Sequence, residues 1–124
     1  MEDQRTQHPL AQVPPVEVAA LSELLKAAPK ARLVLLNWAG SVKGELLKKL
    51  SASGQIYFDI ATLENVGGLA SLFQQVPADR IVFGSHAPFF YFESAALKLK
   101  ESVLSEQQNE AIRGRNAAQL LQGA

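Results

Sequence analysis

The sequence predicts an α/β fold built on a parallel sheet. Three short apolar runs, residues 33–36, 55–60 and 80–83, have the length and composition of buried strands. The segments between them carry apolar residues at helical spacing. Strands that alternate with helices in this way form right-handed βαβ units, so the strands should run parallel. With 124 residues, the chain is one domain at most and long enough to bury a core.

The first helix is expected to follow an amino-terminal loop of about 15 residues. Pro14 and Pro15 mark its start, because proline lacks the N–H that a first helical turn leaves unpaired. Glu17 near the beginning and Lys26 near the end suit the helix dipole, and Pro29 stops the helix. Its apolar stripe comprises Val18, Leu21, Leu24, Leu25 and Ala28.

The run 33–36 is continuously apolar, which predicts a strand buried on both faces. A helix should then extend from about residue 42 to 52 and end at Gly54. Its inward residues are Leu46, Leu47 and Leu50, and its solvent-facing residues are Lys43, Lys48 and Lys49.

The second strand, residues 55–60, has an alternating pattern. Ile56, Phe58 and Ile60 should share one face, with Tyr57 and Asp59 on the other. Asp59 is then either an acid in the interior of a barrel or a helix-facing charge that needs a partner, and we favour a structural role. A helix from about 66 to 76, with Leu69, Leu72, Phe73 and Val76 on one side, leads to the third strand.

The carboxyl-terminal part should be helical. A helix begins near Glu93, and Ser105 with Gln108 three residues later predicts a capping box for the last helix. The apolar side of that helix comprises Ala111, Ile112, Leu120 and Leu121.

A family resemblance rests on the third strand and the last helix. The order Asp79-Arg80-Ile81-Val82-Phe83-Gly84-Ser85, then Pro88-Phe89, and downstream Leu104-Ser105-Glu106 and Asn116-Ala117-Ala118-Gln119-Leu120-Leu121, resembles the end of the amidohydrolase-related family. That family consists of (β/α)8 barrels, among them metal-dependent hydrolases, lactonases and decarboxylases.

The resemblance implies the carboxyl-terminal half of a TIM barrel, that is, a partial (β/α)8 barrel with three to four parallel strands and flanking helices. Residues 1–124 would form this single domain, with 1–15 as a loop segment and 16–124 as βα units. A complete barrel needs roughly 250 residues. We therefore expect the chain to be a fragment, or to cover its open face by self-association or with a missing amino-terminal half-barrel.

The loops after the carboxyl ends of parallel strands carry the chemistry in such folds, and they hold the predicted site. The catalytic candidates are His86 and Asp59. The substrate-binding candidates are Asn37, Trp38, Thr62, Glu64 and Phe89. Three structural alternatives stay open: His86 and Trp38 as packed rings, Glu64 as an acid in the first turn of a helix, and Phe89 with its aromatic neighbours as a seal against solvent.

The usual metal ligands of the family are replaced in this chain. The family has a metal-binding Asp where His86 stands, and a metal-binding His where Asn37 stands. Other acids and imidazoles near the expected site are few, namely Glu2, Asp3, His8, Asp59 and Glu64. The resemblance therefore implies no metal site in this chain alone, and zinc only if missing or partner segments supply ligands.

Composition narrows the partners. Twelve Lys and Arg balance twelve Asp and Glu without a basic cluster, so neither nucleic acid nor a membrane is an expected partner. The absence of cysteine excludes disulfides and thiolate metal sites. No apolar run approaches the ~18 residues of a membrane span, and we expect a cytoplasmic protein.

Two functions follow from these observations. The first is an amidohydrolase-related hydrolase, or a decarboxylase, in which water attacks an amide, a lactone or a related small carbonyl substrate and His86 moves protons. This chain alone is expected to be inactive. The second is a catalytically inactive barrel relative that acts as a binding or assembly module.

Overall fold

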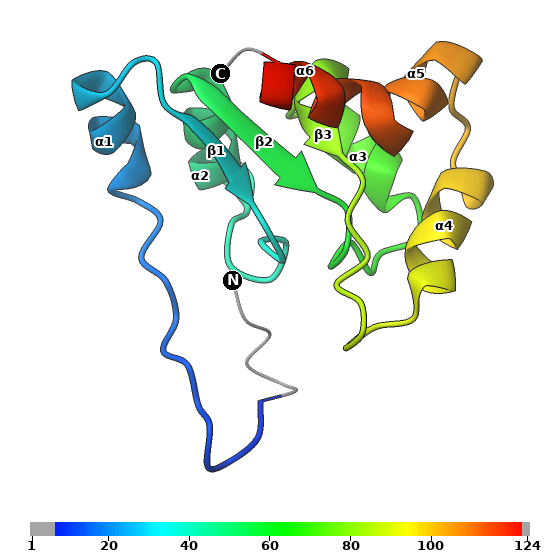
Figure 1. Ribbon diagram of the computed structural model, residues 1–124, viewed down its shortest axis with the longest axis horizontal. Helices are drawn as coiled ribbons and strands as arrows, with labels where there is room; N and C mark the ends of the chain where they lie inside the picture. Colours follow the sequence, from blue (N-terminus) through cyan, green and yellow to red (C-terminus); the bar gives the residue numbers. More distant parts are fainter. Residues whose placement is uncertain (1–6, 123–124) are drawn as a thin grey trace.

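The computed structural model describes residues 7–122. Three strands, β1 (Arg32–Leu35), β2 (Gln55–Asp59) and β3 (Ile81–Val82), form one sheet in the order β1-β2-β3 (Figure 1). Both pairs are parallel, with Leu35 beside Phe58 and Phe58 beside Ile81. The predicted α/β class with a parallel sheet is confirmed, and in the described residues the three strands form an open sheet.

Six α-helices accompany this sheet in the described residues. They are α1 (Leu21–Ala27), α2 (Gly44–Ala52), α3 (Gly68–Phe73), α4 (Phe92–Glu101), α5 (Glu106–Glu110) and α6 (Asn116–Gln122). A 3-10 turn, η1 (Ala78–Arg80), precedes β3, and a π-helical turn, η2 (Ala111–Arg115), joins α5 to α6. No helix in the part of the chain described here has both the length and the apolar character to cross a membrane.

The core lies on one face of the sheet. Ile56, Phe58 and Ile60 are fully buried there, and Tyr57 and Asp59 lie outside this cluster, as the alternation predicts. Figure 1 shows α2 and α3 behind the sheet. The helical residues in the core are Leu25, Leu47, Leu50, Leu69, Leu72, Leu99 and Ile112.

The opposite face of β1 is less covered than the sequence predicts. Leu35 is buried, but Val34 is 37% exposed and Leu36 just beyond the strand is 55% exposed. The prediction that this run is buried on both faces is therefore wrong. Among the described residues β1 pairs only with β2, so it is an edge strand with helices on one side.

Helix α1 is shorter than predicted. It begins at Leu21, and the residues around Pro14 and Pro15 are not helical. Proline also restricts the residue before it to extended conformations, which delays the helix start. Glu17 consequently precedes the helix, and Leu24, expected on the apolar stripe, is more than half exposed.

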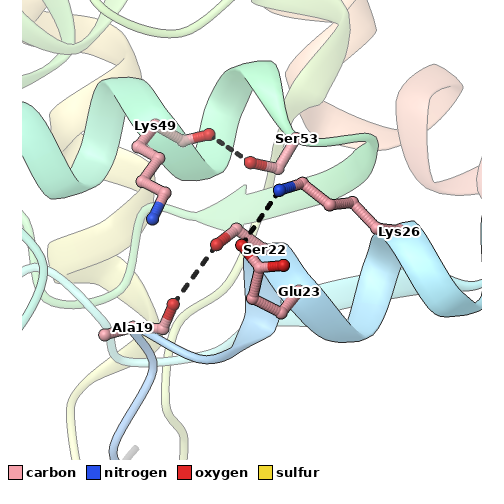
Figure 2. Close-up of polar contacts among 6 residues, drawn as sticks. All are labelled: Ala19, Ser22, Glu23, Lys26, Lys49 and Ser53. Carbon is pink, nitrogen blue, oxygen red and sulfur yellow. Dashed lines mark hydrogen bonds and ion pairs between the residues drawn. The ribbon is translucent and has the colours of Figure 1, made fainter.

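Short-range polar contacts occur at α1 and at the end of α2 (Figure 2). The buried Ser22 hydroxyl donates to the Ala19 carbonyl at 3.3 Å, and Lys26 pairs with Glu23 at 3.0 Å. At the end of α2, the Ser53 hydroxyl donates to the Lys49 carbonyl. Each contact joins residues three or four positions apart in the sequence. These bonds therefore stabilise local structure and do not link the two helices to each other.

The last helical segment begins as predicted and then departs from the expected pattern. The capping box is confirmed, since the Ser105 hydroxyl accepts from the Gln108 N–H and the Gln108 side chain accepts from the Ser105 N–H. However, Leu121, expected on the apolar side, is 75% exposed. The wider turn of η2 rotates the residues that follow it, so that Asn116 faces the sheet instead.

Asn116 ties this helix to the outer edge of β3. Its side-chain NH2 donates to the Ala78 carbonyl at 2.8 Å and to the Ile81 carbonyl at 2.7 Å. Next to it, the Phe83 N–H donates to the Ile112 carbonyl at 2.9 Å. These bonds satisfy backbone groups that an edge strand would otherwise leave unpaired.

We expect Asn116→Ala to lower the free energy of unfolding by about 2–4 kcal/mol, because it leaves two carbonyls at a buried position without their donor. Gln119→Ala, an exposed position of the same helix, is the matched control and should change it by less than about 0.5 kcal/mol. Urea denaturation measures both variants. Equal losses in the two would show that the Asn116 bonds contribute nothing.

Candidate functional site

Asp59 lies at the centre of the carboxyl-terminal edge of the sheet. It is the last residue of β2 and only 3% exposed. Its Oδ1 accepts the Asn37 backbone N–H at 3.1 Å, and its backbone carbonyl accepts Trp38 Nε1–H at 2.8 Å. Asp59 therefore fixes the loop after β1 against the end of β2.

The loop after β3 approaches Asp59 from the other side. A Cβ added at Gly84 would lie 2.6 Å from Asp59 Oδ2 and 2.8 Å from its Cβ. Only glycine allows the backbone to come this close to the carboxyl group. The ends of all three strands thus meet at one buried carboxyl.

Burial raises the pKa of Asp59 above its ordinary value, because a charged carboxylate is poorly solvated there. The Asn37 N–H, which donates to the carboxylate, and the charge of Lys98 oppose this rise. Lys98, on α4, donates from Nζ to the Ile60 and Ala61 carbonyls. Burial lowers the pKa of its ammonium group, and the negative charges of Asp59 and Glu64 partly offset this effect.

Asn37 and His86 meet across the top of Asp59. Each follows a strand, and Asn37 Nδ2 lies 2.8 Å from His86 Nδ1. Both residues have φ of 55°, in the left-handed region that non-glycine residues seldom occupy. Such backbone conformations concentrate at functional sites.

A groove of about 540 Å³ opens beside this network, between the loops after β1 and β2. Four of the five predicted substrate-binding residues line it, namely Asn37, Trp38, Thr62 and Glu64. The Thr62 hydroxyl also accepts the Ala39 N–H at 3.2 Å and so links the two loops. Asn37 is thus in direct contact with His86, and the Thr62 hydroxyl links the loop after β2 to the loop that carries Asn37.

The two aromatic candidates occupy different environments. Trp38 is buried and packs edge-on against Phe58 with the ring centroids 5.2 Å apart, as the packing alternative predicts. Phe89 is 78% exposed and lies outside the groove lining, where it stacks on His86 at 5.2 Å. Phe90 meets the same imidazole edge-on at 5.1 Å. Phe89 and Phe90 therefore pack against His86 and do not line the groove.

Glu64 is not in the first turn of a helix. Helix α3 begins at Gly68 and has no acidic residue in its first turn, so that alternative is wrong. Glu64 instead stands exposed in the loop that forms one wall of the groove. Lys43 lines the same groove, so its wall carries groups of both charges.

The described residues do not fit a zinc site. Within residues 7–122 no group of three or more His, Asp or Glu side chains could hold a metal ion. A catalytic zinc needs three protein ligands, whereas the strand ends offer one imidazole and one buried carboxyl. The exposed His8 accepts the Leu10 N–H at 3.1 Å, far along the chain from this site, and Glu2 and Asp3 fall outside the described residues.

Two residues of the site were missed by the sequence reasoning. Gly84 was treated as the end of a strand, although its close approach to Asp59 is its main structural role. Lys98 was not singled out, although it stands beside the buried Leu99 and three residues after the buried Ala95. A lysine on the apolar stripe of a helix is the signal that could have identified it.

A scan of the sequence against protein-family models gives no match, and a comparison with curated proteins gives none either.

We expect Gly84→Ala to destabilise the protein by about 1–3 kcal/mol, because its methyl group would overlap the Asp59 carboxyl. Gly114→Ala is the matched control, since a Cβ there meets nothing within 4 Å. In a helical segment that change should be neutral or stabilising by up to about 1 kcal/mol. Thermal or urea unfolding distinguishes the two, and similar values for both variants would contradict the close contact.

The raised pKa of Asp59 predicts a pH dependence of stability. The folded protein binds the Asp59 proton more tightly than the unfolded chain does, and this difference stabilises the fold. The stabilisation is fully present below the ordinary Asp pKa of 3.8 and is lost as the pH rises through the higher pKa of Asp59 in the folded protein. We therefore expect the difference in stability between the wild type and Asp59→Asn to shift against the wild type from about pH 4 towards neutrality. Urea denaturation across this range measures it, and parallel curves for the two proteins would refute it.

Proposed function

We propose that this chain carries one side of a hydrolase site for an amide, a lactone or a related small carbonyl compound. In this proposal it forms the carboxyl-terminal half of a barrel like those of the amidohydrolase-related family. The observation that carries the proposal is Asp59, a buried carboxyl with a raised pKa where three parallel strands end. Groups of this kind beside a cleft are candidates for acid–base chemistry.

Asp59 is suited to move a proton because its environment favours the protonated form more than water does. In the proposed reaction a water oxygen bonds to the carbonyl carbon, and the bond from that carbon to nitrogen or oxygen breaks. Asp59 carries the proton from the water to the leaving atom. The products are a carboxylic acid and an amine or an alcohol.

The groove supplies the binding surface for the substrate. Asn37 belongs both to the groove wall and to the network around Asp59, so it is the residue that separates a molecule in the groove from the acid, which itself does not line the groove. Thr62 and Glu64 form the wall contributed by the loop after β2. Because the lining combines these polar groups with apolar residues such as Leu47, Leu63 and Leu72, we expect a small substrate with both polar and apolar parts.

The edge of the sheet supports the partial-barrel part of this proposal. Val34 is 37% exposed on a strand that pairs on one side only among the described residues. An edge strand with exposed apolar side chains favours pairing with a further strand. We propose that another half-barrel, or a second copy of the chain, covers this face.

The alternative is an inactive relative that only binds or assembles. One observation favours it: Asp59 and Trp38 both make contacts that join loops, which is a structural role that needs no chemistry. In that case the groove would still bind a small molecule. Binding and turnover must therefore be measured separately.

The test uses a panel of small amides, lactones and esters, with ligand-observed NMR for binding and product analysis for turnover. We expect Ser71→Trp, which fills the groove, to weaken binding at least ten-fold, whereas Gln74→Trp, outside the lining, leaves binding unchanged. Asp59→Asn should retain binding and reduce turnover about 10²- to 10⁴-fold.

The outcomes separate the two functions. Binding that depends on Ser71 supports the groove under either function, and turnover in addition to binding excludes the inactive binding module. Turnover that Asp59→Asn leaves unchanged refutes the role of Asp59. Binding that both tryptophan variants leave unchanged refutes the groove as the site.

A further inference from the structure

The contact between Asn37 and His86 determines more than the position of the imidazole ring. The contact joins Asn37 Nδ2 to His86 Nδ1 at 2.8 Å. An amide NH2 can only donate, so Nδ1 must accept and carry no proton. In the neutral ring the proton then resides on Nε2.

The side-chain amide of Asn37 has a second conceivable orientation, with its oxygen and nitrogen exchanged. If the Asn37 amide were turned over, its Oδ1 would accept a proton from Nδ1, and its NH2 would occupy the place that Oδ1 has now. In the structure Oδ1 is buried and has no hydrogen-bond partner. The turned amide would thus leave a donor group unpaired in the same place, and buried unpaired N–H groups are rarer than under-satisfied carbonyl oxygens.

The surroundings of His86 hold this arrangement in place. Phe89 stacks on the imidazole and Phe90 meets it edge-on, with ring centroids 5.2 and 5.1 Å away. The Asn37 backbone is itself fixed, because its N–H donates to Asp59. Among the described residues, Asn37 makes the only hydrogen bond to the His86 ring.

We infer that Asn37 is a positioning residue that holds neutral His86 in the Nε2–H tautomer, so that His86 acts as a hydrogen-bond donor and not as a proton acceptor. This inference rests on the proposed function and refines it. His86 does not line the groove, and its Nε2–H is the ring group left to donate to a carbonyl oxygen that gains negative charge as water attacks. Proton transfer in the same reaction is then left to Asp59.

The tautomer can be read directly from the ring nitrogens of 15N-labelled histidine by long-range 1H–15N NMR at mildly alkaline pH. The chain has two histidines, so His8 serves as an internal reference in every spectrum. Asn37→Gly removes the amide and retains a backbone suited to positive φ. Asn37→Asp replaces the donor by an acceptor of the same shape.

We expect the wild type to show His86 mainly as the Nε2–H tautomer. Asn37→Gly should reduce that preference by about five-fold, the effect of one hydrogen bond of ordinary strength. Asn37→Asp should move the proton towards Nδ1, and the His8 signals should not change. If Asn37→Gly fails to fold, Asn37→Asp gives the decisive spectrum.

An unchanged His86 tautomer in the variant that folds overturns the inference. This result is independent of activity, so it differs from a failure of the proposed hydrolase. If turnover is found that Asp59→Asn leaves unchanged but the tautomer shifts as expected, the positioning role of Asn37 stands and the proposed role of Asp59 falls. If turnover depends on Asp59 but the tautomer does not depend on Asn37, the reverse holds.

Discussion

The contacts of the Asp59 carboxyl group are the constraint on which the rest of the site depends. Asp59 Oδ1 accepts a hydrogen bond from the Asn37 N–H, and the backbone carbonyl of Asp59 accepts one from Trp38 Nε1–H. Gly84 lies against Asp59 Oδ2. A carboxyl group is costly to bury unless it gains such partners. Once it is buried, the loops after β1 and β3 have a common anchor, and the groove beside them acquires a fixed wall.

The same contacts and burial affect both the geometry of the Asp59 carboxyl group and its pKa. A carboxyl that anchors two loops is held rigidly, which favours a defined geometry for proton transfer. Its burial also raises its pKa and makes the charged form unfavourable. The positive φ angles of Asn37 and His86 are a second local strain that the surrounding contacts must offset. Strain and burial at one rim are the pattern expected where function limits stability.

The two edges of the sheet differ in how well their residues are covered. The outer edge of β3 is covered by the last helix, since Asn116 and the Ile112 carbonyl bond its backbone groups. The exposed Val34 marks β1 as the edge from which the sheet could be extended. Within residues 7–122, protection of one edge alone is consistent with extension of the sheet at the other edge, as the proposal of a partial barrel requires.

The sequence by itself determined the order of the elements, the parallel sheet, the two faces of β2 and the capping box at Ser105, because periodicity and capping are local properties. It also determined that residues after different strands lie near one another, as Asn37 and His86 do, since parallel strands end at one edge. Only the tertiary structure decided that Val34 is exposed, that η2 brings Asn116 to the sheet, and that Gly84 and Lys98 adjoin the Asp59 site. These features arise from contacts between residues far apart in the chain, which no local pattern encodes.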